Sequence, residues 1–171
     1  GADLTAEDTT SVALKALNCR RCTFYDITAI NFMYGVFPNG VGTGTVENRF
    51  YISDIRNCRW GLFIDGDSGG WSHQNYFEGG RIKIDGTSNR NRDIDIECGA
   101  IYVNGDNCTF NSINLEGSSH AKYCIFSEAS SNKWFNCRFE GVYAGQIKFS
   151  SPAYGNEMIL MMKGTSLAST V

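Results

Sequence analysis

Proline and histidine are scarce in this chain, and long hydrophobic runs are missing. The 171 residues include two prolines and two histidines, and the hydrophobic 42% never forms the run of about 20 residues that a membrane span requires. A strong charge of one sign is also lacking, since 15 Lys and Arg stand against 18 Asp and Glu. Such a weak net charge gives nucleic acid or an anionic bilayer little to bind. We therefore expect neither nucleic acid binding nor membrane insertion.

The seven cysteines are an odd number spread along the chain, so they do not form a dense disulfide framework. Four of them are predicted to be reduced and buried at strand positions in the core: Cys58, Cys98, Cys124 and Cys137. Cys19 and Cys22 have the spacing of half a zinc site, but no second pair follows and both histidines are distant in sequence. We therefore expect no metal and no cofactor.

The chain contains 19 glycines, and 13% of its residues are aromatic, a mixture typical of short strands joined by tight turns. The sequence also contains an internal repeat. The stretch "FNSINLEG" (Phe110–Gly117) matches "WFNCRFEG" (Trp134–Gly141) at a spacing of 24 residues. The matched pairs are Phe110 with Trp134, Ile113 with Cys137, Leu115 with Phe139, Glu116 with Glu140, and Gly117 with Gly141. A further step of 24 leads from Trp134 to Met158 and from Cys137 to Met161.

Looser copies lie upstream, where "RIKIDG" (Arg81–Gly86) resembles "SINLEG" (Ser112–Gly117) at a spacing of 31. A second motif alternates with the first, namely a short hydrophobic strand, a turn and then asparagine. Its copies are "GLFIDGDSGGWSHQN" from Gly61, "AIYVNGDN" from Ala100, "CIFSEASSN" from Cys124 and "QIKFSSPAYGN" from Gln146. The turn residues Asn107, Asn132 and Asn156 are predicted to form a hydrogen-bonded ladder between repeats.

Each repeat of 22 to 32 residues holds two or three short strands whose side chains alternate inward and outward. One unit cannot bury its inner face, but a stack of units buries a continuous core and joins equivalent strands into parallel sheets. The sequence therefore predicts an all-β, single-stranded parallel β-helix of about five to six coils over residues 17–162. Residues 1–16 are expected to be a cap or linker, and residues 163–171 a C-terminal tail.

The pattern Asn-x-x-Phe followed by apolar-x-apolar-Glu-Gly resembles the right-handed parallel β-helix of the pectate-lyase-like superfamily, especially bacteriophage tailspike and tail-fibre proteins. The resemblance implies a homotrimer on the virion tail, outside the cell, that recognises a bacterial surface polysaccharide, with or without cleaving it. Two alternatives stay open. One is a secreted polysaccharide lyase or hydrolase that acts as a monomer, and the other is a purely structural trimeric shaft.

Catalysis, if present, is expected from paired carboxylates, because glycoside hydrolysis uses two acids about 5 to 10 Å apart. Adjacent coils are about 4.8 Å apart, so equivalent acids on neighbouring coils fall within this range. Asp85, Glu116 and Glu140 are predicted to form one such column, and Asp65 with Asp67 a second group in the glycine-rich turn "IDGDSGG". The alternative is structural, since an acid followed by glycine is also typical of a strand-to-turn junction.

Aromatic side chains supply the second ingredient of a sugar site, a flat hydrophobic surface for a pyranose ring. The candidates for carbohydrate binding are Trp60, Trp71 and Tyr76, with His73 beside them. Trp71 lies in the irregular turn and is expected to be exposed, whereas Trp134 aligns with Phe110 and is expected in the core. Trp60 is alternatively a contact to a neighbouring chain in a trimer.

Overall fold

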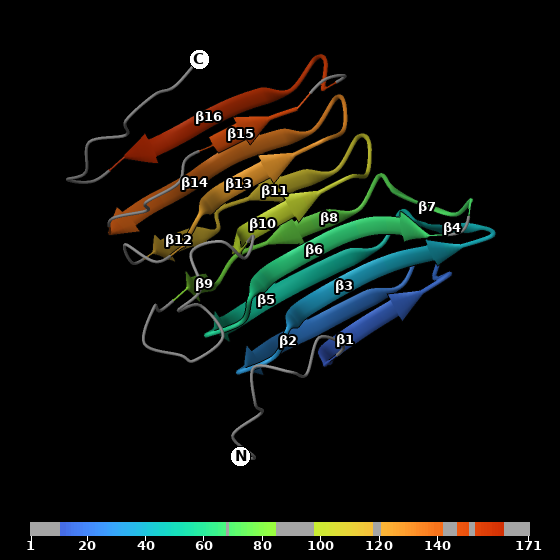
Figure 1. The fold of residues 1–171 in the computed structure, drawn as a ribbon, viewed down its shortest axis with the longest axis horizontal. Helices are drawn as coiled ribbons and strands as arrows, with labels where there is room; N and C mark the ends of the chain where they lie inside the picture. The colour runs from blue at the N-terminus through green and yellow to red at the C-terminus, as the bar shows by residue number, and fades with distance from the viewer. Residues whose placement is uncertain are drawn as a thin grey trace.

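The computed structural model describes residues 11–67, 69–84, 98–117, 121–141, 147–150 and 153–162, with the backbone alone at Asp67 and at 160–162. Every regular element in this part of the chain is a β-strand, and the described strands pair in parallel. The strands stack as a parallel β-solenoid of about five turns, which confirms the predicted fold class (Figure 1). The chain climbs from β1 at the bottom of Figure 1 to β16 at the top.

Six strands form one sheet, which we call the front sheet because it faces the viewer in Figure 1. In order they are β1 (Val12–Leu17), β3 (Tyr34–Val41), β6 (Trp60–Asp67), β10 (Gly99–Val103), β13 (Tyr123–Ser127) and β15 (Ile147–Phe149). Strand pairing therefore begins at Val12, before the boundary expected at Leu17.

Eight strands form the opposite sheet, which we call the back sheet. They are β2 (Thr23–Ile30), β5 (Arg49–Arg56), β8 (Tyr76–Glu78), β9 (Arg81–Ile84), β11 (Thr109–Asn111), β12 (Asn114–Gly117), β14 (Lys133–Gly141) and β16 (Glu157–Met162). A third, two-stranded sheet pairs β4 (Gly44–Val46) with β7 (Trp71–His73) beside the ends of the front strands (Figure 1).

The core between the sheets consists of columns of equivalent side chains. The clearest column is a stack of near-parallel rings, Phe24, Phe50, Phe77, Phe110 and Trp134, with centroids 4.9 to 5.3 Å apart. Trp134 is fully buried, as are the four cysteines assigned to the core, which confirms both predictions. Like side chains stack here because one repeat follows another at the spacing of a parallel sheet.

The strand register confirms the 24-residue repeat, since Phe110 pairs with Trp134 and Glu116 with Glu140. The downstream extension is confirmed at Trp134, which pairs with Met158, but it is wrong at Cys137, and the upstream extension is wrong as well. A β-bulge around Asn136, whose φ is +52°, shifts the register so that Cys137 pairs with Leu160 instead of Met161. The spacing between β9 and β12 is 33 rather than 31, so Glu116 pairs with Lys83.

The asparagine ladder is present, but one of its predicted members was wrong. The Oδ1 atom of Asn132 accepts the backbone N–H of Cys108 at 2.8 Å, and that of Asn156 accepts the N–H of Asn132 at 2.8 Å. Cys108 therefore occupies the ladder position in its coil, and Asn107 precedes it with a φ of +57°. Two asparagines that were not predicted, Asn48 and Asn75, continue the ladder toward the N-terminus.

Candidate functional site

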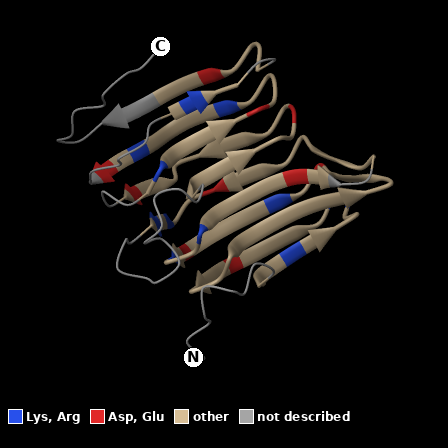
Figure 2. Ribbon diagram, viewed as in Figure 1, with Lys and Arg blue, Asp and Glu red and all other residues tan. Residues whose placement is uncertain are grey.

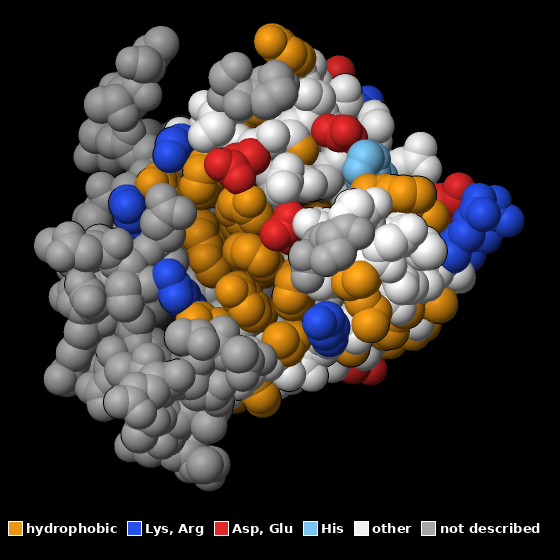
Figure 3. All heavy atoms as spheres, turned by 45° about the vertical axis from the view of Figure 1, so that its right-hand side comes forward, with side chains coloured by type: hydrophobic (Ala, Val, Ile, Leu, Met, Phe, Trp, Pro, Cys, Tyr) orange, Lys and Arg blue, Asp and Glu red, His pale blue; other side chains and the backbone are white. Residues whose placement is uncertain are grey.

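The outward face of the front sheet carries one aromatic side chain from each of four successive strands. We call this set the aromatic row: Phe37, Phe63, Tyr102 and Phe126. Strand register places them side by side, with Tyr102 opposite Phe63 and Phe126, and the ring centroids of successive members lie 4.5 to 5.5 Å apart. Hydrophobic residues of the same strands, such as Leu62 and Ile64, fill the core instead. Figure 3 shows the resulting hydrophobic area in the middle of this surface.

A second set of rings borders the row where the front strands begin. Tyr34 pairs with Trp60, and Trp60 stacks on Tyr123 across the intervening coil with centroids 6.2 Å apart. The stack is possible because Gly99 lies between them; a Cβ at this position would stand 2.8 Å from the Trp60 ring. Trp60 is 4% exposed, so its ring supports the aromatic row and offers little surface of its own to a sugar.

Polar side chains follow the aromatic row two residues further along each strand. We call Asp65, Asn104 and Glu128 the polar row. The Asn104 amide donates to Asp65 Oδ1 at 3.0 Å, and the hydroxyl of Tyr102 donates to Glu128 Oε2 at 2.6 Å. Asp65 Oδ1 also accepts the N–H of Gly66 at 2.8 Å. These bonds fix carboxylates and an amide beside the aromatic row, in which Phe63 and Tyr102 are stacked at an interplanar angle of 17°.

The electrostatics connect this row to the neighbouring rings. Burial raises the pKa of the Tyr34 hydroxyl, the Arg59 guanidinium opposes that rise, and the negative charge of Asp65 adds to it. Arg59, Tyr34, Trp60, Phe63 and Tyr102 line one shallow hollow of about 390 Å³ together with Phe126, Glu128 and Lys148. The aromatic row is therefore bordered by groups of both charges.

Next to the polar row lies a second hollow of about 430 Å³, which we call the rim hollow. Trp71, His73, Asn104, Asp106 and Glu128 line it. The predicted exposed aromatic is confirmed, since Trp71 is 46% exposed. His73 Nδ1 lies 3.9 Å from Asp106 Oδ2, and Asp106 Oδ1 accepts the backbone N–H of Ser130 at 2.7 Å. Glu128 lines both hollows, so they form one continuous surface.

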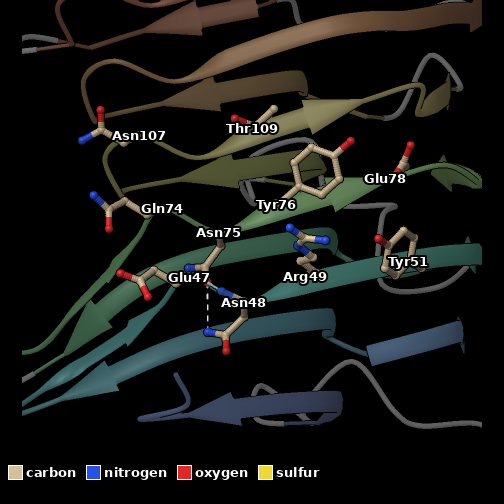
Figure 4. A pocket seen from close by; sticks show the side chains of 10 residues that line it. All are labelled: Glu47, Asn48, Arg49, Tyr51, Gln74, Asn75, Tyr76, Glu78, Asn107 and Thr109. Carbon is tan, nitrogen blue, oxygen red and sulfur yellow. Dashed lines mark hydrogen bonds between the residues drawn. The ribbon is translucent and has the colours of Figure 1, made fainter. Parts of the chain in front are cut away.

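Tyr76, the remaining carbohydrate candidate, lies on the back sheet and does not line the hollow that contains Trp71. It lines a groove of about 540 Å³ with Arg49, Tyr51, Glu78 and Thr109 (Figure 4). Its hydroxyl accepts a hydrogen bond from Asn111 at 3.1 Å. Burial raises its pKa, the bond from Asn111 lowers it and the charge of Glu78 raises it. The ladder asparagines form the floor of this groove.

The predicted carboxylates divide between the two faces. Glu116 and Glu140 are side by side on the outer face of the back sheet, where Arg81 contacts Glu116 at 3.9 Å and Arg138 pairs with Glu140. Asn114 donates to both acids, at 2.9 and 3.5 Å. With Lys83 opposite Glu116, the expected alignment of Asp85 with Glu116 was wrong. Asp85 itself and the side chain of Asp67 lie outside the described residues.

Sequence reasoning pointed to Asp65, Trp71 and His73 and missed their neighbours. The expected turn position of Asp65 and Trp71 was wrong, because they lie in strands β6 and β7. Trp71 and His73 line the rim hollow, and Asp65 is joined to it through the hydrogen bond from Asn104. The missed residues are Asn104, Asp106, Glu128 and the aromatic row. A signal for them existed in the second motif, where "LFID", "IYVN" and "IFSE" place Phe63, Tyr102 and Phe126 at the same position. Reading that motif for its outward residues would have found the row.

Within the described ranges, no group of three or more His, Cys, Asp or Glu side chains is arranged to hold a metal ion. The same part of the chain contains no helix long and hydrophobic enough to cross a membrane. Comparison of the chain with family models, with curated proteins and with solved structures gave no match. Its class is therefore defined by the fold alone, a parallel β-solenoid.

Proposed function

We propose that this solenoid is a polysaccharide-recognition domain of the kind found in bacteriophage tailspikes and tail fibres, and that its front face binds the glycan. The observation that carries the proposal is the juxtaposition of the aromatic row, the polar row and Trp71 on one continuous surface. Sugar rings stack on aromatic faces, while their hydroxyls bond to carboxylates and amides. A repeating scaffold that presents repeating rings suits a repeating polymer.

The proposed setting is the virion tail, where the chain would act as a homotrimer on a bacterial surface polysaccharide. Support for this comes from the sequence resemblance stated above. Static light scattering tests the trimer against a monomer of 18.9 kDa. A monomer that still binds glycans would favour the secreted enzyme, and a trimer that binds none would favour the structural shaft.

Affinity electrophoresis through gels that contain bacterial capsular or lipopolysaccharide O-chains tests recognition directly. Trp71→Ala removes the exposed ring of the rim hollow and is expected to weaken retardation by tenfold or more, by analogy with nucleobases, whose stacking on one aromatic side chain contributes about 1–3 kcal/mol. Tyr25→Ala is the matched control, because Tyr25 is 70% exposed on the back sheet. Equal retardation of the wild type and Trp71→Ala would contradict the assignment of this face.

Cleavage is a second candidate function, favoured by the spacing of Asp65 and Glu128. They stand in equivalent positions two coils apart, with Asn104 between them, and two coil steps correspond to about 10 Å, near the separation used by inverting glycosidases. Glu128→Gln is expected to abolish release of reducing ends while glycan retardation persists. The double variant Glu116→Gln/Glu140→Gln tests the back-sheet pair, and loss of cleavage there instead would move the reaction to that face.

A further inference from the structure

The aromatic row ends in a lysine on both sides. Lys15 on β1 pairs with Phe37, and Lys148 on β15 pairs with Phe126, so one outward position reads Lys, four aromatic rings, Lys across the six strands of the front sheet. Lys15 Nζ lies 5.4 Å from the Phe37 ring centroid, and Lys148 Nζ lies 4.2 Å from that of Phe126. Figure 2 shows these basic residues on the first and last strands of the sheet.

Two further cations border the same surface. Lys122 Nζ lies 5.5 Å from the Tyr123 ring centroid, and Arg59 lines the hollow beside Trp60. The described acids of this surface are Asp65, Glu128 and Asp106, and each already accepts a hydrogen bond, from Asn104, from Tyr102 and from the backbone N–H of Ser130 in turn. The whole chain has a formal net charge of −3, so this cationic border is a local feature that composition does not explain. Figure 3 shows blue side chains around the hydrophobic area, together with red ones.

The geometry points to a linear, carboxylate-bearing polysaccharide as the occupant of this face, an inference that rests on the proposed function and specifies its substrate class. Successive rings repeat along the solenoid axis at about 4.8 Å, so a polymer laid along that axis contacts Phe37, Phe63 and Tyr102 in turn. Phe126, which is 4% exposed beneath Lys148, supports the row from within. Lys15 and Lys148 lie five coil steps apart, roughly 24 Å, and would bind acidic groups at both ends of the bound segment. The ammonium groups supply charge complementarity that a neutral glycan would not use.

A second copy of this chain, packed face to face on this surface, fits less well. A two-fold contact of this surface with itself would bring Lys15, Lys122, Lys148 and Arg59 of one copy near the same cations of the other. Like charges placed together across an interface are costly. A glycan with carboxylates removes that repulsion, and its sugar rings still cover the aromatic row.

The test compares a panel of acidic polysaccharides, namely hyaluronate, alginate, polygalacturonate and acidic bacterial capsules, each with its carboxyl-reduced neutral form. Affinity electrophoresis at low and at high salt measures binding to the wild type and to Lys15→Gln/Lys148→Gln. Lys133→Gln, an exposed lysine on the back-sheet strand β14, is the matched control. Urea midpoints equal to that of the wild type establish that each variant is folded.

We expect at least one acidic glycan to bind, with retention reduced about tenfold or more by carboxyl reduction or by the double lysine variant, since hydrogen bonds to charged groups are the stronger class. Its salt dependence should fall in the double variant and stay unchanged in Lys133→Gln. Equal binding of the acidic and neutral forms would overturn the inference and leave the proposed function intact. A change of solution mass in the double lysine variant would assign the face to chain association and overturn it as well. Failure of every glycan to bind would refute both proposals.

Discussion

The column of stacked rings inside the solenoid makes stability depend on where in the stack a ring is lost. Phe77 is fully buried and has a stacked neighbour on each side, Phe50 at 4.9 Å and Phe110 at 5.1 Å. Phe24 is at the end of the column, partly buried, with a single stacked neighbour. Replacement by leucine keeps a hydrophobic side chain of similar size at either position but removes the ring.

The expected cost follows from these contacts. Each ring pair contributes about 0.5–1.5 kcal/mol beyond its buried area, and the volume lost from a closed core adds about 1 kcal/mol. Phe77→Leu should therefore lower the free energy of unfolding by about 2–4 kcal/mol. Phe24→Leu, which loses one pair in a partly open site, should cost about 1–2 kcal/mol.

Urea unfolding followed by circular dichroism measures both values, provided that the slope with denaturant stays the same in both variants. The reasoning requires Phe77→Leu to be clearly the more damaging of the two. Equal losses, or a larger loss at Phe24, would show that stacking within the column does not determine the stability of the solenoid.

Three further predictions concern the ladder, the thiols and the front face. Asn75→Ala removes four hydrogen bonds from a buried position and should lower the free energy of unfolding in urea by about 2–4 kcal/mol. A decrease below about 1 kcal/mol would show that the asparagine ladder does not stabilise the solenoid. Burial raises the pKa of the Cys108 thiol to about 12, so native protein at mildly alkaline pH should react with a thiol reagent at the exposed Cys22 and not at Cys108. Cys108 ionises in the unfolded chain before it does in the folded protein, so its contribution to the free energy of unfolding should fall as the pH rises from 9 toward 12. A rise of stability across that pH range would contradict the assignment. Gly99→Ala places a Cβ 2.8 Å from the Trp60 ring and should shift the tryptophan fluorescence while lowering the urea midpoint, and unchanged values of both would refute the tight contact.

Part of the site was predictable from the sequence because its signal is local. The glycine-rich stretch at the end of β6 departs from the repeat, and this irregularity alone pointed to Asp65, Trp71 and His73, of which Trp71 and His73 line the rim hollow. Asp106 and Glu128 come from two later coils and join them only through the stacking of strand ends. The acid pair expected from the 24-residue repeat is real, but it lies on the other sheet among arginines.

The sequence by itself determined the fold class and the register over residues 109–141, because turns of equal length separate equivalent residues by a constant 24 positions. It could not determine the register between β9 and β12, since a slip by two residues leaves the same side chains facing inward and does not change the hydrophobic pattern. The tertiary structure alone decided which outward residues meet. Phe37, Phe63 and Tyr102 are separated by unequal loops, and only hydrogen bonding between neighbouring coils brings them into one row between two lysines.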